Sequence, residues 1–66
     1  MSALQTFVGK WVTIEDSLSM YVGAKAEIID AETVAGEAWF CCAIGGRGGD
    51  YQWMLGHEIS PKIVVI

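Results

Sequence analysis

The residues of this chain that could carry chemistry are few and lie apart. His57 and Glu58 form the only adjacent pair of a histidine and a carboxylate, and no serine or cysteine has a predictable position beside them as a nucleophile. Cys41 and Cys42 stand in an apolar run, where burial raises the pKa of a thiol and opposes reactivity. We therefore expect a turn histidine, two buried thiols and no catalytic residue.

A disulfide or a metal site is also not expected. Adjacent side chains of a strand point to opposite faces, which opposes a bond between Cys41 and Cys42. Two neighbouring thiols and His57, the single histidine, do not supply the four ligands of a zinc site. The Gly-rich segment 45–49 lacks the Gly-Lys-Ser/Thr signature and no helix pattern follows it, so we interpret it as a hairpin loop. No cofactor is implied.

The charge balance argues against nucleic acid as a partner. Four Lys and Arg residues face eight Asp and Glu residues, and the basic ones are scattered along the chain. Binding of DNA or RNA depends mainly on Lys and Arg contacts to phosphates. The apolar runs are much shorter than the roughly 20 residues that span a bilayer, and residues 1–5 lack a signal-peptide pattern. We expect no membrane association and a cytoplasmic location.

The aromatic residues are the most informative group. Seven aromatic side chains are too many for the interior of a 66-residue domain, so some are expected at the surface. Trp39 and Phe40 must point to opposite faces of one strand, and exposed apolar patches generally mark interaction surfaces. The alternative is that residues 1–9 or the loop 15–23 cover them. We predict a binding surface and self-association, with these binding residues: Glu15, Asp16, Tyr21, Trp39 and Trp53.

Strand-forming residues between turn signals predict five strands, at 10–14, 24–30, 38–45, 50–55 and 62–66. Residues 15–23 are expected to form a loop in which Met20 and Tyr21 either pack onto the domain or remain available to a partner. Residues 31–36 are interpreted as a loop, with a short helix as the alternative. A single 3-10 turn is expected within 56–61, and residues 1–9 fit either a helical turn or the start of a strand.

This pattern resembles the SH3-like small barrels. The resemblance rests on the loop 15–23 after the first strand, the Gly-rich hairpin 45–49 and the segment 53–61 that leads into the last strand. It covers almost the whole chain but is architectural. The motifs of peptide-binding SH3 domains, such as paired tryptophans and a terminal Pro-x-x-Tyr, are not matched. The resemblance implies an all-β, five-stranded barrel formed by residues 1–66 as one domain.

Two function classes fit these observations. The first is a non-enzymatic protein-interaction module, such as a small accessory protein of a phage or mobile element that binds and modulates a host protein. The second is a small oligomeric enzyme or ligand carrier whose pocket forms between subunits. We favour the first, because no catalytic constellation accompanies the apolar and acidic surface.

Overall fold

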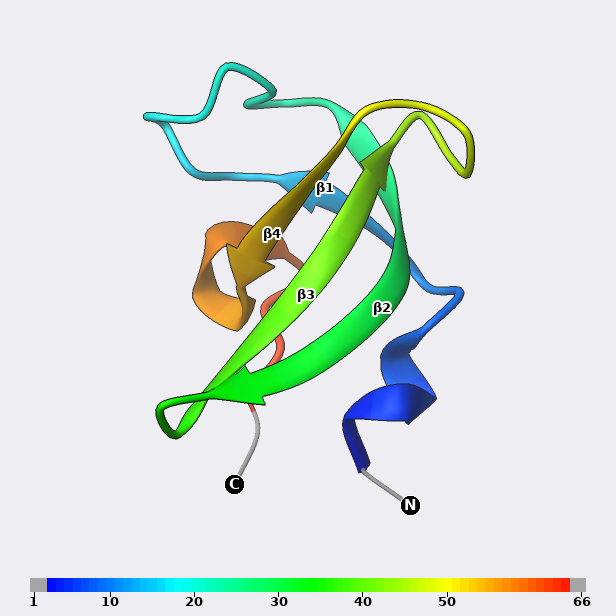
Figure 1. The fold of residues 1–66 in the computed structure, drawn as a ribbon. Helices are drawn as coiled ribbons and strands as arrows, with labels where there is room; N and C mark the ends of the chain where they lie inside the picture. The colour runs from blue at the N-terminus through cyan, green and yellow to red at the C-terminus, as the bar shows by residue number, and fades with distance from the viewer. Residues whose placement is uncertain (1–2, 65–66) are drawn as a thin grey trace.

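The computed structural model describes residues 3–64 as one antiparallel five-stranded sheet with two short 3-10 helices (Figure 1). The strands follow the order β4-β3-β2-β1-β5 across the sheet, and no pairing among the described residues joins β4 to β5. The predicted all-β fold with five strands is confirmed. The elements are η1 (Ala3–Phe7), β1 (Trp11–Ile14), β2 (Lys25–Val34), β3 (Glu37–Ile44), β4 (Tyr51–Leu55), η2 (Gly56–Glu58) and β5 (Ile59–Ser60).

Strand β2 is longer than the sequence suggested. The predicted loop at 31–36 and its helical alternative are both wrong, because β2 continues to Val34, which pairs with Glu37 at the start of β3. The connection contains two residues, Ala35 and Gly36, with φ values of 52° and 81°. Positive φ at both central positions is the geometry of the tight turn that joins twisted strands. Alanine rarely adopts a positive φ, so the residue types Ala35-Gly36 did not indicate a hairpin turn at this position.

A β-bulge at Ile29 bends β2 in its middle. Ile28 lies opposite Cys42, whereas Asp30 lies opposite the next residue of β3, Cys41, so Ile29 is an extra residue on β2. An inserted residue shifts the alternation of faces and curves the strand. Ala26 and Ile28 are therefore buried before the bulge and Ala31 after it. The ribbon of β2 is curved along its length (Figure 1).

The core lies on the concave side of the sheet and is closed by both ends of the described chain. Phe40 is fully buried, and its ring meets that of Phe7 edge-to-face with 5.7 Å between centroids. The N-terminal segment thus forms a helical turn, η1, which buries Leu4 and is attached by a hydrogen bond from Gln5 Nε2 to the carbonyl of Ala31 at 3.0 Å. The other core side chains that are almost completely buried include Ile14, Ile28, Met54 and Ile59.

The last strand lies earlier than predicted. The expected strand at 62–66 is wrong for residues 62–64, which are in no strand, and positions 65–66 lie outside the described residues. Ile59 instead pairs with Ile14 and is fully buried, which draws Ile59–Ser60 into the sheet. Pro61 has no N–H to continue the ladder. The predicted 3-10 turn is confirmed as η2, where Glu58 Oε1 accepts a hydrogen bond from the amide of Leu55 at 2.7 Å.

Candidate interaction surface

The loop of residues 15–23 is anchored by side-chain hydrogen bonds to Asp50 and Gln52, at the start of β4. Ser19 is buried and donates its hydroxyl to Gln52 Oε1 at 3.2 Å. The same hydroxyl oxygen accepts the amide of Tyr21 at 3.0 Å, and the Tyr21 hydroxyl donates to Asp50 Oδ2 at 3.1 Å. The loop closes through the amide of Gly23, which donates to the carbonyl of Ile14 at 2.8 Å. The predicted loop is confirmed, and it packs beside the start of β4.

These anchors leave three apolar side chains in solvent. Leu18 is 93% exposed, Met20 is 86% exposed and Val22 is 52% exposed. They alternate along the chain with the anchoring residues Ser19 and Tyr21, so fixing the anchors directs the other three side chains outward. We call Leu18, Met20 and Val22 the apolar tip. The sequence analysis named Met20 and Tyr21, either packed or available to a partner, and did not name Leu18 or Val22. The alternation of apolar and polar residues over 17–20 was a signal for Leu18.

Two carboxylates make hydrogen bonds with the loop that carries the apolar tip, and a third precedes it in the chain. Glu15 is exposed, and Asp16 accepts the amide of Leu18 on Oδ1 at 3.1 Å. Asp50 faces Tyr21 across the loop, and its hydrogen bond, followed by partial burial and its negative charge, raises the pKa of the Tyr21 phenol. Residues 11–24 contain no Lys or Arg. We call Glu15, Asp16 and Asp50 the acidic rim of this loop.

The five predicted binding residues do not form one surface. The Ser19 hydroxyl meets Gln52, which alternation along β4 places on the same face as the buried Met54, so the loop lies on that side of the sheet. Trp53 points to the opposite, outer face, where it lines a shallow groove with Trp39, Glu32 and Val34. The contact of Tyr21 is with Asp50 and not with a tryptophan. The structure thus separates Glu15, Asp16 and Tyr21 from Trp39 and Trp53.

Both cysteines are free, buried thiols on opposite faces of β3. Burial, followed by the neighbouring thiol, raises the pKa of Cys42 to about 11. Burial, followed by the negative charge of Asp30, also raises the pKa of Cys41. At neutral pH both are protonated, and a protonated thiol is a poor nucleophile. The arrangement opposes thiol chemistry.

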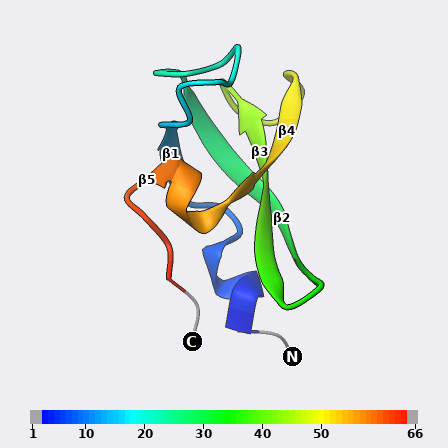
Figure 2. The same cartoon turned by 90° about the vertical axis from the view of Figure 1, so that its left-hand side faces the viewer.

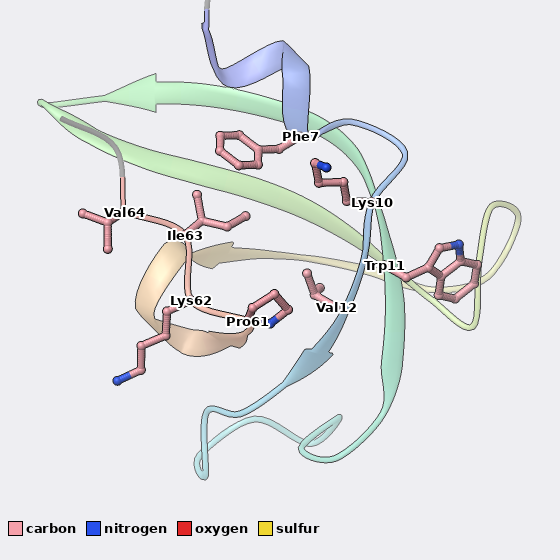
Figure 3. Close-up of a pocket in the computed structure, with 8 residues that line it drawn as sticks. All are labelled: Phe7, Lys10, Trp11, Val12, Pro61, Lys62, Ile63 and Val64. Carbon is pink, nitrogen blue, oxygen red and sulfur yellow. The ribbon is translucent and has the colours of Figure 1, made fainter.

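A second groove lies between β1 and the segment that follows β5 (Figure 3). Phe7, Val12, Pro61 and Ile63 contribute to its lining, as does Trp11, whose ring extends toward the Gly-rich loop. The lining contains two lysines but no carboxylate, histidine or cysteine. It offers no pair of groups for acid and base catalysis.

The described residues 3–64 contain no group of three or more histidines, cysteines or carboxylates placed to hold a metal ion. No helix in that part of the chain is long and apolar enough to cross a membrane. Comparison with protein-family models, with curated proteins and with solved structures found no match to this chain. The surface itself therefore carries the functional argument.

Proposed function

We propose that this protein is a non-enzymatic interaction domain that binds another protein through its apolar tip. The observation that carries the proposal is that Leu18 and Met20 are 93% and 86% exposed in a loop that Ser19 and Tyr21 hold in place. An ordered loop that exposes large apolar groups has little conformational entropy left to lose on binding. Burial of exposed apolar surface is the dominant favourable term in most protein–protein association.

The acidic rim defines the chemistry of the partner. Glu15 and Asp16 precede the apolar tip in the loop, Asp50 accepts a hydrogen bond from Tyr21 in the same loop, and the chain carries a formal charge of −4. The complementary surface is an apolar recess bordered by Lys and Arg residues, because interfaces combine a desolvated centre with a polar edge. Opposite charges at such an edge accelerate association and make it depend on salt.

The SH3-like barrel remains our proposal for the fold family. It is supported by the antiparallel strand order β4-β3-β2-β1-β5 and by η2 immediately before the last strand. A cytoplasmic setting is supported by two free thiols buried in the domain, because reducing compartments keep thiols in this form. We further propose that the protein is an accessory protein, of a phage or mobile element, that modulates its partner by occupying the partner's surface.

Affinity capture with matched variants tests this function. The wild-type chain, a Leu18→Ser/Met20→Ser variant and a Val34→Ser control are immobilised and exposed to lysate of the cells that produce the protein. Val34 is 54% exposed on the outer face, away from the loop. We expect a protein that wild type and control retain, that the loop variant loses, and whose retention falls as salt rises. Identical captured proteins for all three chains would overturn the proposal.

A further inference from the structure

Strand β4 forms one edge of the sheet, and β5 forms the other (Figure 2). The loop 15–23 reaches this edge through the side chains of Asp50 and Gln52, and no further strand pairs with the β4 backbone in the described residues. The opposite edge, β5, contains two residues and is followed by Pro61, both of which discourage pairing with another strand. The sequence of β4, Tyr-Gln-Trp-Met-Leu, contains neither a charge nor a proline, and no bulge interrupts its pairing with β3. Long uncharged edges invite pairing with a further strand.

The residues of β4 alternate between bonding to β3 and directing their backbone groups away from it. The amide of Ile44 donates to the carbonyl of Asp50 at 2.6 Å, so this opposite pair is a hydrogen-bonded one. Because such pairs alternate along antiparallel strands, Gln52 and Met54 also bond to β3, whereas Tyr51, Trp53 and Leu55 direct their amides and carbonyls outward. The Leu55 amide confirms this direction, since it bonds to Glu58. Among residues 3–64, no hydrogen bond is found at the outward amides of Tyr51 and Trp53.

We infer that a second copy of this chain pairs with β4 in antiparallel fashion about a two-fold axis at Gln52. In that register Tyr51 of one copy lies opposite Trp53 of the other. The outward amide and carbonyl of each residue then bond to the carbonyl and amide of the residue opposite in the other copy. The two aromatic side chains share the outer face and meet across the interface. Cross-strand aromatic pairs of this kind stabilise sheets.

The absence of charge on β4 and the exposure of its aromatic residues favour this occupant. With the axis at Gln52, Asp50 lies opposite Met54 of the second copy and not opposite another carboxylate, so two chains of formal charge −4 meet along their uncharged strand. Tyr51 is 65% exposed and Trp53 is 36% exposed in the single chain, and pairing covers both. The interface includes no residue of the apolar tip, although Gln52 and Asp50 also anchor the loop 15–23.

Sedimentation and amide exchange test the pairing. Wild type is expected to reach twice the mass of one chain in the micromolar range. Tyr51→Lys places a charge on the edge and should raise the dissociation constant at least about tenfold, as edge lysines oppose pairing. The control Leu18→Lys alters the apolar tip and should leave the dimer intact. A monomer at millimolar concentration, or equal dissociation constants for wild type and Tyr51→Lys, would refute the inference.

Amide exchange in the wild-type chain gives an independent reading that requires no variant. In dilute solution the Tyr51 and Trp53 amides should exchange rapidly, whereas the Gln52 and Met54 amides, bonded to β3, should exchange slowly. At high concentration Tyr51 and Trp53 should become slow as well. Exchange at these two amides that does not change with concentration would contradict pairing at β4. The partner-capture experiment depends on Leu18 and Met20, so each hypothesis can fail alone.

Discussion

Replacement of Ser19 by alanine tests whether the loop is held by its anchors. Ser19→Ala removes two hydrogen bonds, the 3.2 Å bond to Gln52 and the 3.0 Å bond from the Tyr21 amide. Each such bond contributes about 0.5–1.5 kcal/mol net, so the free energy of unfolding should fall by about 1–3 kcal/mol. For a domain of this size a loss of about 1 kcal/mol lowers Tm by about 4–8 °C.

Urea denaturation followed by circular dichroism measures this loss, and amide exchange at Tyr21 localises it. The matched control is Ser17→Ala, because Ser17 is exposed in the same loop and its side chain makes no hydrogen bond with the described residues. The control should change stability by less than about 0.5 kcal/mol. If Ser19→Ala were as stable as the control and its Tyr21 amide exchanged no faster, the loop would not depend on these anchors.

Three further predictions concern the core, the thiols and the Gly-rich loop. Phe40→Ala empties a fully buried site beside Phe7 and should cost about 3–5 kcal/mol in denaturant titrations, whereas Phe40→Leu should remain folded; equal stability of Phe40→Ala and wild type would contradict the packing. Because the pKa of Cys42 is raised from an ordinary 9.0 to about 11, the unfolded chain loses this proton first. The contribution of Cys42 to the free energy of unfolding should therefore be complete below pH 9 and should decline toward pH 11. Cys42→Ala should reduce this decline, and a free energy of unfolding that does not change between pH 9 and 11 would refute the prediction. Gly49→Ala should destabilise the β3–β4 turn, because a Cβ at this position collides with the Ile44 carbonyl oxygen. The control Arg47→Ala in the same loop removes an ion pair with Glu27 and should cost less than about 1 kcal/mol. Similar losses of stability for both variants in thermal melts would argue against this collision.

The strands that the sequence predicted well are those with strong local signals. The apolar run at 38–44 and the segment 51–55 combine aromatic or β-branched residues with flanking glycines or charges, and both became strands. The signal failed at 31–34, where the pairing partner and an unusual Ala35 turn extend β2. It also failed at the C-terminal end, because the pairing of Ile59 with Ile14 depends on contacts between distant parts of the chain.

The candidate surface was predictable only in part. The sequence located the loop 15–23 and left open whether Met20 and Tyr21 pack or remain exposed. The answer depends on the hydrogen bonds of Ser19 and Tyr21 to residues about thirty positions away in the chain. These bonds attach Tyr21 to the domain and leave Met20 exposed. No local pattern could separate the loop from Trp39 and Trp53, because that separation follows from which face of β4 the loop approaches.

Photo-crosslinking from position 20 tests the central proposal most directly. A photoreactive amino acid is introduced at Met20, in the apolar tip, and in a matched chain at Val34, which is exposed on the outer face. Both chains are irradiated in the cells that produce the protein, and the adducts are identified by mass spectrometry. We predict one protein adduct from position 20 that is absent from position 34 and whose crosslinked site borders an apolar recess with Lys or Arg residues. No adduct from position 20, or the same adducts from both positions, would contradict a binding site at the apolar tip.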